Sequence, residues 1–332
     1  MSERKVSVVI PCHNSEKFIF EAISSVLRQT YNDIEIIVVD DGSSDDSWDV
    51  IKSFKEKKVK SIRQENKGGC NARNIGFSYA KGDYVMFLDS DDMIGPNVVE
   101  SLVNTFKRGS DISACSWKRL VNENNSWLEK PSGLEKRPIN NDFLYAWLSG
   151  WYIPPSALMW SREALEETGN WDESLAANQD GDLIMRALLS GKKINYSDKG
   201  VAYYRSHGVS KISVSNNVKS ISALKSRIKV LKKISSKLAE LGRLEKYKVV
   251  IGQAYHKLAR NSFLVDLYLA RSCVKESKIL AGKKSIIGSM PHKMIVHMMG
   301  LENKEMLVGK MLSKFYVNKT RRKFNKLKKN LV

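Results

Sequence analysis

The chain has 332 residues, of which 42% are hydrophobic and 27% charged, and its formal net charge is +19. This length fits one large domain or two modest ones. The four cysteines form no CxxC pair and are far apart in sequence, which argues against a disulfide framework or a zinc site. No run approaches the roughly 18 apolar residues of a spanning helix, and the start has no signal-peptide pattern, so we expect a cytosolic protein.

The net charge is distributed very unevenly. Residues 1–215 contain 27 basic and 30 acidic side chains, a net charge of −3, whereas residues 216–332 contain 28 and 6, a net charge of +22. A change of this size predicts two domains, residues 1–215 and residues 216–332, with different partners.

The first 90 residues alternate between two patterns. Short apolar runs rich in β-branched residues predict strands at 5–10, 34–39, 59–63 and 83–88. Apolar residues at helical spacing predict helices between them, at 15–29, 43–57 and 71–80. Ser15 is the expected N-cap of the first helix. The alternation predicts an α/β fold whose mainly parallel sheet is flanked by helices on both sides.

Polar clusters follow three of these strands: "PCHN" the first, "DDGS" the second and "DSDD" the fourth. Such residues are common in turns. However, ligands of parallel sheets bind beyond the carboxyl ends of the strands, where these three clusters should meet. An acidic site suits a hard divalent cation that bridges to phosphate. Asp89 and Asp91 would lie on the same side if the chain stays extended.

Two common nucleotide-binding motifs are missing. No GxxxxGK[ST] occurs, which excludes a P-loop, and no GxGxxG follows the first strand, which excludes the dinucleotide fingerprint. Sugar-nucleotide pyrophosphorylases usually have a Gly-rich basic loop after their first strand, and "PCHNSEKF" is no such loop.

The segments "VSVVIPCHN", "IIVVDDGSSDDS", "ENKGGCNARNIG" and "YVMFLDSDD" together resemble the family 2 glycosyltransferases, which have the GT-A fold. The likeness continues in "NQDGDLIMRALLSGKKI" (178–194) and "YYRSHGVS" (203–210), so it covers about the first 210 residues. It implies an inverting transfer of a sugar from a nucleotide donor, usually UDP-linked, to an acceptor hydroxyl.

The resemblance also assigns a pocket for the base of the nucleotide. It implies that the backbone at Pro11 and the side chain of Asp41 hold the base. Asn66 and Arg73 complete this nucleotide pocket. His13 stands where Tyr or Phe is usual in the family, and we expect it to stack on the base.

The same resemblance assigns a site for the ribose, the diphosphate and a metal. Asp89 is expected to face the ribose and Asp91 to ligate Mn²⁺ or Mg²⁺ bridging the diphosphate, whereas Asp92 is expected to support the turn. His207, in "YRSH", matches a family histidine that reaches the metal or the diphosphate. Bound metal and diphosphate would offset the charge of the Asp cluster.

The family places its general base in an acidic pair ahead of a helix. The matching residues are Gln179, where Glu is usual, and Asp180, which we expect to be the base. The alternative is that Asp180 only caps the helix. Trp151 and Tyr152 precede the base, and they either contact the acceptor sugar or belong to the core.

The C-terminal third predicts basic helices, one amphipathic over 218–241 and a second helical region over 244–280. The segment 319–329 is basic with spaced apolar residues. These features favour peripheral attachment to an anionic cytoplasmic leaflet. Alternatives are a helical domain with a solvated Lys-rich face, which could also mediate oligomerisation, and nucleic-acid binding, for which no motif is present.

The leading hypothesis is a metal-dependent inverting glycosyltransferase that modifies a glycan or lipid-linked acceptor in bacterial surface polysaccharide synthesis. One rival is a non-catalytic sugar-nucleotide or glycan-binding module on the same fold. The other is a basic adaptor for membrane or nucleic acid. Donor hydrolysis would distinguish the first rival, and salt-dependent binding to liposomes or DNA the second.

Overall fold

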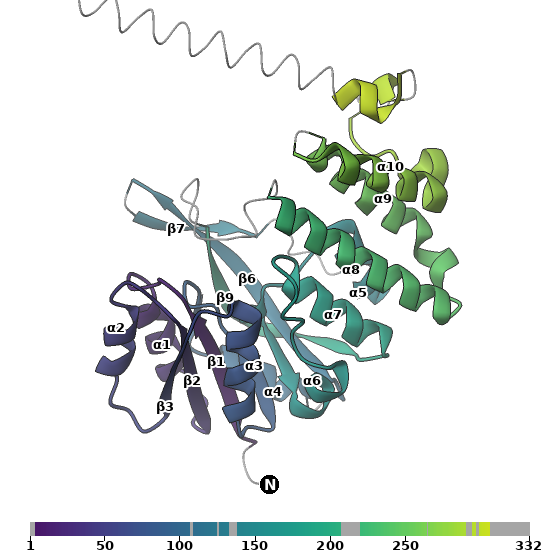
Figure 1. Cartoon of the computed structure of the whole chain (residues 1–332). Helices are drawn as coiled ribbons and strands as arrows, with labels where there is room; N and C mark the ends of the chain where they lie inside the picture. The colour runs from purple at the N-terminus through teal and green to yellow at the C-terminus, as the bar shows by residue number, and fades with distance from the viewer. Residues whose placement is uncertain are drawn as a thin grey trace, which may run out of the picture. The chain divides into compact units, whose positions relative to one another are not determined.

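The computed structural model describes residues 4–106, 109–124, 126–132, 138–206, 220–263, 265–289, 294–296 and 299–305. The chain divides into two compact units, Met1–Asn216 and Asn217–Val332, and each is described by itself (Figure 1).

The N-terminal unit is built on one mixed sheet. Its strands are β1 (Val6–Cys12), β2 (Ile34–Asp41), β3 (Val59–Gln64), β4 (Tyr84–Phe87), β5 (Met93–Ile94), β6 (Ile112–Glu123), β7 (Ser126–Pro131), β8 (Leu158–Ser161) and β9 (Ile194–Ser206). Within the described ranges their order is β3-β2-β1-β4-β8-β6-β9-β5, and β7 pairs with β6. The four strands β3, β2, β1 and β4 run parallel, as the sequence predicts, and β8 joins β4 antiparallel.

Helices cover both faces of this sheet. They are α1 (Ile19–Leu27), α2 (Ser47–Ser53), α3 (Gly69–Tyr79), α4 (Val98–Phe106), α5 (Phe143–Ser149), α6 (Arg162–Thr168) and α7 (Gln179–Leu189), with short 3₁₀ turns η1 (Ile139–Asn141) and η2 (Pro155–Ala157). The chain moves outward from β1 to β3 and then returns past β1 to β4. Because parallel crossovers are right-handed, this reversal puts α3 on the face opposite α1 and α2, where it packs on β1 and β2 (Figure 1).

The strand β1 shows why the sheet forms. All seven of its residues are buried, and its β-branched side chains fill both faces of a central strand. Every residue of β2 except Glu35 is also buried. A run that is apolar on both faces can bury itself only between two helical layers, which fixes the three-layer architecture.

Two predicted helix starts were wrong. The first helix begins at Ile19, and the carbonyl of Ser15, not its hydroxyl, accepts from the N–H groups of Phe18 and Ile19 at 2.9 and 3.0 Å. The second begins only at Ser47 because the Asp45 carboxylate accepts from the Ser47 N–H at 3.0 Å and holds the preceding residues in a turn.

The C-terminal unit is helical in its described residues, with α8 (Ile221–Glu240), α9 (Leu244–Ser262), α10 (Leu267–Ala281) and the 3₁₀ turn η4 (Gly282–Ser285). The predicted helix over 218–241 corresponds to α8. The predicted region 244–280 is two helices, because Asp266 caps a new one by accepting from the Leu269 N–H at 3.0 Å. Helices α9 and α10 pack closely, and a Cβ on Gly252 would come within 2.6 Å of the Ala281 Cβ.

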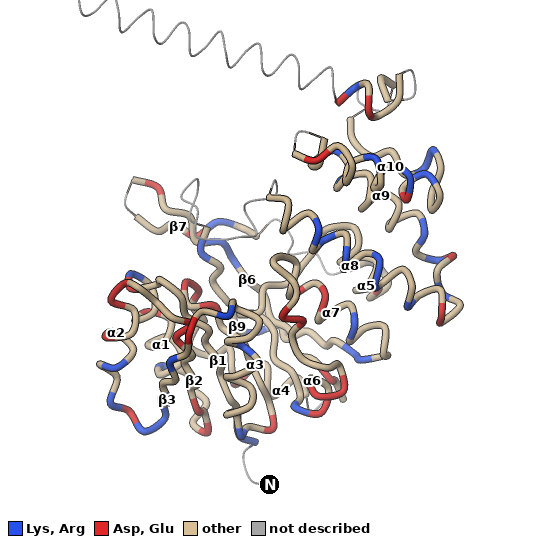
Figure 2. Tube along the Cα trace, viewed as in Figure 1, with Lys and Arg blue, Asp and Glu red and all other residues tan. Residues whose placement is uncertain are grey.

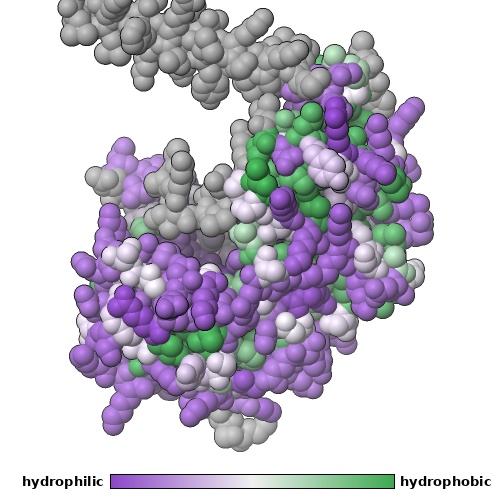
Figure 3. Space-filling view, in the orientation of Figure 1, coloured by the Kyte–Doolittle hydropathy of each residue, from purple (hydrophilic) through white to green (hydrophobic). Residues whose placement is uncertain are grey.

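The surface of this unit is both basic and partly apolar. Figure 2 shows Lys and Arg (blue) along its helices, and Figure 3 shows hydrophobic residues (green) at its visible surface. Tyr268 is 82% exposed, Ile279 66% and Met294 59%. None of the helices in the described ranges combines the length and the apolarity needed to cross a bilayer.

Candidate active site

The three polar clusters meet at one edge of the sheet. Cys12 pairs with Asp40 across β1 and β2, and Val9 pairs with Phe87 across β1 and β4, so the ends of the three strands are adjacent. Side chains also join the loops that follow: Ser43 Oγ accepts from the Asn14 N–H at 3.0 Å. The topology therefore assembles the predicted binding edge.

Asp41, at the end of β2, organises the loop that follows β3. Its Oδ1 accepts from the Lys67 N–H at 2.8 Å and from Gln64 Nε2 at 2.7 Å, and its Oδ2 accepts from the Gly68 N–H at 2.8 Å. The residue is only 3% exposed. Because a carboxylate has about four acceptor positions, these three bonds leave one position on Oδ2 for a ligand.

His13 and Asn66 lie beside this carboxylate. His13 Nδ1 is 2.9 Å from the carbonyl oxygen of Asp41, and Asn66 Nδ2 is 3.1 Å from the same ring nitrogen. Gly42 allows this approach: its φ is +70°, and a Cβ there would lie 2.8 Å from the Asn66 nitrogen. Pro11 is buried in β1 opposite Val39.

Arg73, in α3, connects the strand edge to α7. Its Nη2 forms a 2.6 Å ion pair with Asp89 Oδ1, and its Nη1 donates to Gln179 Oε1 at 3.3 Å. The guanidinium lies 4.6 Å from the centre of the Trp171 ring. One cation therefore links the residue expected at the ribose to the residue that precedes the expected general base.

Asp180 lies in the first turn of α7 and is half-buried. The N-cap position belongs to Asn178, with φ +58°, so Asp180 is not the cap. Burial raises the pKa of Asp180 above its ordinary value and the negative charge of Asp89 adds to this, whereas the Gly181 N–H and Arg73 lower it. Asp182, in contrast, is fully buried and paired with Arg186 at 2.8 Å.

The segment after β4 turns rather than staying extended. The Asp92 N–H donates to the Asp89 carbonyl at 3.0 Å, so the extended chain on which the alignment of Asp89 with Asp91 depended is not formed. Asp92 is fully buried and accepts from the Arg205 N–H at 2.9 Å and from Ser156 Oγ at 3.1 Å. Burial, with repulsion from Asp91 and Asp89, holds the pKa of Asp92 well above its ordinary value.

The carboxylate oxygens of this turn suit a hard divalent cation as ligands. Asp89 and Asp91 supply carboxylate oxygens, but within the described ranges no group of three His, Cys, Asp or Glu side chains is placed to hold a metal. Mg²⁺ and similar ions are often bound by one or two carboxylates and complete their shell with water and substrate phosphate. The residues present fit that arrangement. His207, the other expected ligand, lies outside the described residues.

The two candidate acceptor residues differ in their surroundings. Trp151 packs against Phe143, with ring centres 6.1 Å apart. Tyr152 packs against Trp117 at 5.3 Å. Burial raises the pKa of the Tyr152 phenol, Arg119 lowers it, and the negative charges of Asp180 and Asp92 raise it further.

Sequence reasoning missed a further group of aromatic side chains near the turn formed by residues 89–92. Tyr204 in β9 packs edge-on against Trp117 in β6, with ring centres 6.1 Å apart. Burial raises the pKa of Tyr204, and so does the charge of Asp92. Arg119, also in β6, has a buried Nε without a hydrogen-bond partner in the described part of the chain. Tyr204 lies in the segment "YYRSHGVS", which could have indicated it, whereas no motif distinguishes Trp117 or Arg119 from ordinary strand residues.

Comparison with known proteins identifies the family of the N-terminal part of the chain. Residues 7–169 match the model of the family described as "Glycosyl transferase family 2". The chain carries a glycosyl transferase family 2 domain. The domain is similar to an uncharacterized glycosyltransferase of Nostoc sp., 35% identical over 212 residues, which cover 61% of this chain and 65% of the relative.

Two further relatives match shorter or more distant stretches. Glycosyltransferase GlyG of Streptococcus pneumoniae is 45% identical over 100 residues, 29% of this chain and 33% of GlyG. Uncharacterized glycosyltransferase EpsJ of Bacillus subtilis is 28% identical over 214 residues, 60% of each chain. The chain thus spans less than two thirds of the length of these curated relatives.

The solved structures establish the fold. The crystal structure of S. aureus TarS 1–349 superposes with a TM-score of 0.55 at 20% identity, covering 85% of this chain and 90% of that one. The complex of TarS 1–349 with UDP-GlcNAc gives a TM-score of 0.56 at the same identity and coverage. The family 2 domain therefore has the GT-A fold that its sequence resemblance implies.

Proposed function

We propose that this protein is an inverting glycosyltransferase that moves a sugar from a nucleotide donor to an acceptor hydroxyl. The observation that carries the proposal is the link from Asp89 through Arg73 to Gln179, which joins a nucleotide-binding edge to a half-buried Asp180. The family 2 domain supports it, as do relatives named glycosyltransferases.

The proposed donor is a UDP-sugar. TarS 1–349 has been crystallised with UDP-GlcNAc and with UDP, and it shares this fold. In the present chain, the remaining acceptor position of Asp41 would take an N–H of the base. The backbone at Pro11 and the side chains of His13 and Asn66 would line the same pocket.

The proposed cofactor is Mn²⁺ or Mg²⁺. Asp89 would accept from the ribose hydroxyls, and Asp91 would hold the metal against the donor diphosphate. When bound, the ion neutralises charge on the diphosphate leaving group. Asp92 has a structural role instead. Its two carboxylate oxygens accept from the Arg205 N–H and Ser156 Oγ, and these bonds hold the turn in place.

Asp180 is the proposed general base. In a single displacement, the acceptor oxygen attacks the anomeric carbon, the bond to the diphosphate breaks, and the hydroxyl proton passes to the Asp180 carboxylate. Burial raises the pKa of Asp180, which makes this carboxylate a stronger base than an ordinary aspartate. Arg73 restrains the neighbouring Gln179 and so helps to orient the first turn of α7.

The proposed acceptor is a glycan or a lipid-linked sugar on the inner face of the cell membrane. Tyr152 and Tyr204 offer aromatic surface near the turn formed by residues 89–92, and sugars present apolar faces to such rings. The C-terminal unit combines a sequence net charge of +22 over residues 216–332 with exposed apolar side chains such as Tyr268 and Ile279. Both features favour an anionic membrane surface, and the same apolar residues would also suit contact between copies of the chain.

The test is a panel of UDP-, GDP- and dTDP-sugars with Mn²⁺, measured by thermal shift and by release of the nucleoside diphosphate. We expect one UDP-sugar to stabilise the protein and to be hydrolysed slowly without acceptor. The matched control is Asp180→Asn, which should bind the donor but hydrolyse it much more slowly. Binding without hydrolysis by the unmodified protein would favour the non-catalytic sugar-nucleotide module instead.

A further inference from the structure

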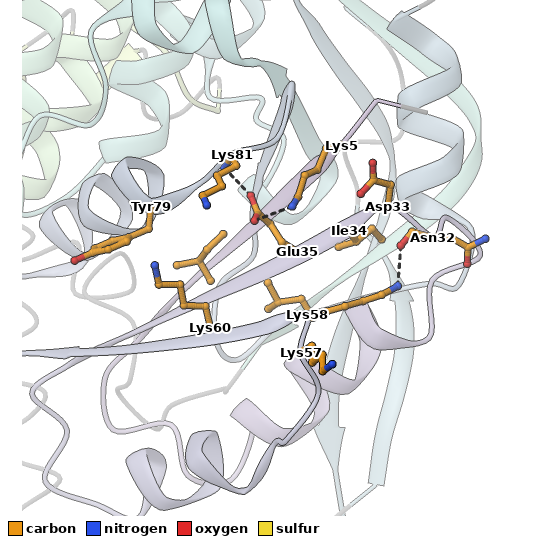
Figure 4. Close-up of a pocket in the computed structure, with 12 residues that line it drawn as sticks. Lys5, Asn32, Asp33, Ile34, Glu35, Lys57, Lys58, Lys60, Tyr79 and Lys81 are labelled. Atoms are coloured by element: carbon orange, nitrogen blue, oxygen red, sulfur yellow. Dashed lines mark hydrogen bonds and ion pairs between the residues drawn. The ribbon is translucent and has the colours of Figure 1, made fainter. Parts of the chain in front are cut away.

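A pocket lined by lysines lies at the edge of the sheet opposite the candidate active site (Figure 4). It has a volume of about 380 Å³, which is within the range of small-molecule sites. The start of β1, the start of β2, the turn into β3 and the end of α3 form its walls. Because the pocket is lined by residues 34–37 of β2, it lies about 13 to 23 Å along this strand from Asp41 at the candidate active site.

The pocket carries a net positive charge, although the N-terminal unit as a whole has a small net negative charge. Residues 1–215 have a net charge of −3, yet two carboxylates, Asp33 and Glu35, accompany five lysines here. The lysines are Lys5, Lys57, Lys58, Lys60 and Lys81. The local net charge is therefore +3, and like charges on the walls of a concave pocket repel one another unless an anion lies between them.

The two carboxylates do not neutralise this group. Glu35 Oε1 accepts from Ser7 Oγ and from the Lys81 N–H, each at 2.6 Å, and Glu35 Oε2 pairs with Lys5 Nζ at 3.2 Å. Although burial opposes it, these contacts hold the pKa of Glu35 below its ordinary value. Among the residues drawn in Figure 4, no ion pair joins the Asp33 carboxylate to a lysine of the pocket.

Within the described residues, no carboxylate pairs with the other lysines of the pocket. Lys58 Nζ donates to the Asn32 carbonyl at 2.7 Å. Lys60 Nζ lies 3.9 Å from the centre of the Tyr79 ring, which is a neutral partner, and Tyr79 is 45% exposed. Among the described residues, neither Lys57 nor Lys81 has an anionic partner for its ammonium group. In Figure 4, Lys60 and Lys81 lie on the Tyr79 side of the pocket and come from different elements, β3 and the end of α3, whereas Lys57 lies apart from them.

We propose that this pocket binds a phosphate-bearing anion at a site separate from the donor edge. A tetrahedral phosphate presents several oxygens in different directions, so ammonium groups from different elements can each meet one of them. A planar carboxylate offers only two. The phosphate could belong to a free ion or to an anionic lipid headgroup, since both present the same group to the lysines.

The first experiment maps protection of individual lysines on the full chain. Lysine acetylation is measured by mass spectrometry in two arms. One arm contains inorganic pyrophosphate in excess chelator, and its control is chloride of equal ionic strength. The other contains phosphatidylglycerol vesicles, and its control is phosphatidylcholine vesicles. The reference lysines are Lys193 and Lys199, which are exposed in the same unit and outside the pocket.

We expect Lys60 and Lys81 to be protected more strongly than Lys193 and Lys199. Protection by pyrophosphate alone would identify a free phosphate ligand, and protection by phosphatidylglycerol alone would identify a lipid headgroup. Protection by both would support the shared chemistry. Protection in neither arm beyond that of the reference lysines would overturn the proposal.

The second experiment measures pyrophosphate affinity by calorimetry in chelator. The double variant Lys60→Gln/Lys81→Gln should bind about 2- to 30-fold more weakly, the range expected for two exposed charge pairs. The control Lys193→Gln/Lys199→Gln removes the same charge and should bind like the unmodified protein. Equal losses in both variants would show only general attraction to a basic chain and would also overturn the proposal. Neither experiment depends on sugar transfer.

Discussion

Arg73 and Asp89 form a 2.6 Å ion pair that ties the middle of α3 to the residue just beyond β4. The Arg73 side chain is 11% exposed and that of Asp89 27%. The pair lies between the proposed nucleotide-binding edge and the start of α7, so we expect its loss to affect both folding and donor binding.

Arg73→Met tests this connection. The methionine keeps an apolar stem against Trp171 but leaves Asp89 without its partner. We expect the free energy of unfolding to fall by about 1–3 kcal/mol, the usual cost of leaving a buried polar group unpaired. Denaturant unfolding and donor titration measure the two effects. Lys193→Met is the control, and equal stability of the two variants would contradict the structural role of the pair.

Asp91→Ala should uncouple metal binding from nucleotide binding. In the proposed site, metal and UDP would each offset charge that the other leaves exposed, so we expect each to strengthen the other's binding. The variant should keep its fold, because Asp91 lies in a turn and not in the core. Calorimetry with and without chelator measures the coupling, with the exposed Asp46→Ala as a charge-matched control. UDP binding that chelation leaves unchanged in the unmodified protein would contradict the proposed metal site.

Asp180→Asn should separate binding from chemistry. The amide keeps the size of the side chain but cannot accept the proton of the acceptor hydroxyl. We expect donor affinity close to that of the unmodified protein and a transfer rate reduced by at least about a hundredfold. Steady-state kinetics and donor titration provide both values.

Near-normal turnover of Asp180→Asn would mean that the base lies elsewhere. The nearby Asp182 would be tested next, although its burial and its 2.8 Å pair with Arg186 predict a loss of stability instead. Asp182→Asn should therefore lower the unfolding midpoint more than Asp180→Asn does.

The decrease of kcat/KM at acidic pH should reflect protonation of Asp180. The pKa of this carboxyl lies above its ordinary value of 3.8, so kcat/KM should fall, as pH decreases, earlier than for an unperturbed aspartate. Asp89→Asn removes a negative charge that raises this pKa, and it should move the decrease to lower pH. A decrease that stays in place or moves to higher pH in Asp89→Asn would assign it to another group.

Deletion of residues 310–332 should weaken membrane association more than catalysis. The segment 319–329, KTRRKFNKLKK, is strongly basic, and each basic residue near an anionic surface contributes on the order of 1 kcal/mol. We expect reduced sedimentation with phosphatidylglycerol vesicles and nearly unchanged transfer to a soluble acceptor analogue. Full sedimentation of the shortened chain would show that other residues provide the attachment.

The sequence was sufficient to predict the binding edge. The runs 5–10, 34–39 and 83–88 are apolar on both faces, and each ends abruptly in polar residues. Parallel strands align their carboxyl ends, so this local pattern already requires the clusters around His13, Asp41 and Asp89 to converge. The helix starts were less predictable, because at Ser15 and Asp45 short-range hydrogen bonds to turn residues compete with helical ones.

Only the tertiary structure decided which side chains meet at that edge. Arg73 reaches Gln179 across 106 positions, and Asp92 accepts from the Arg205 N–H across 113. Such pairs depend on the order of strands in the sheet and on the register of β8 and β9, which no local pattern encodes. The sequence by itself determined where the strands end in polar residues, because the change from a continuous apolar run to polar side chains is a local signal. Long-range packing determined the pairing of Arg73 with Asp89, the burial of Asp92 and the charge around Asp180.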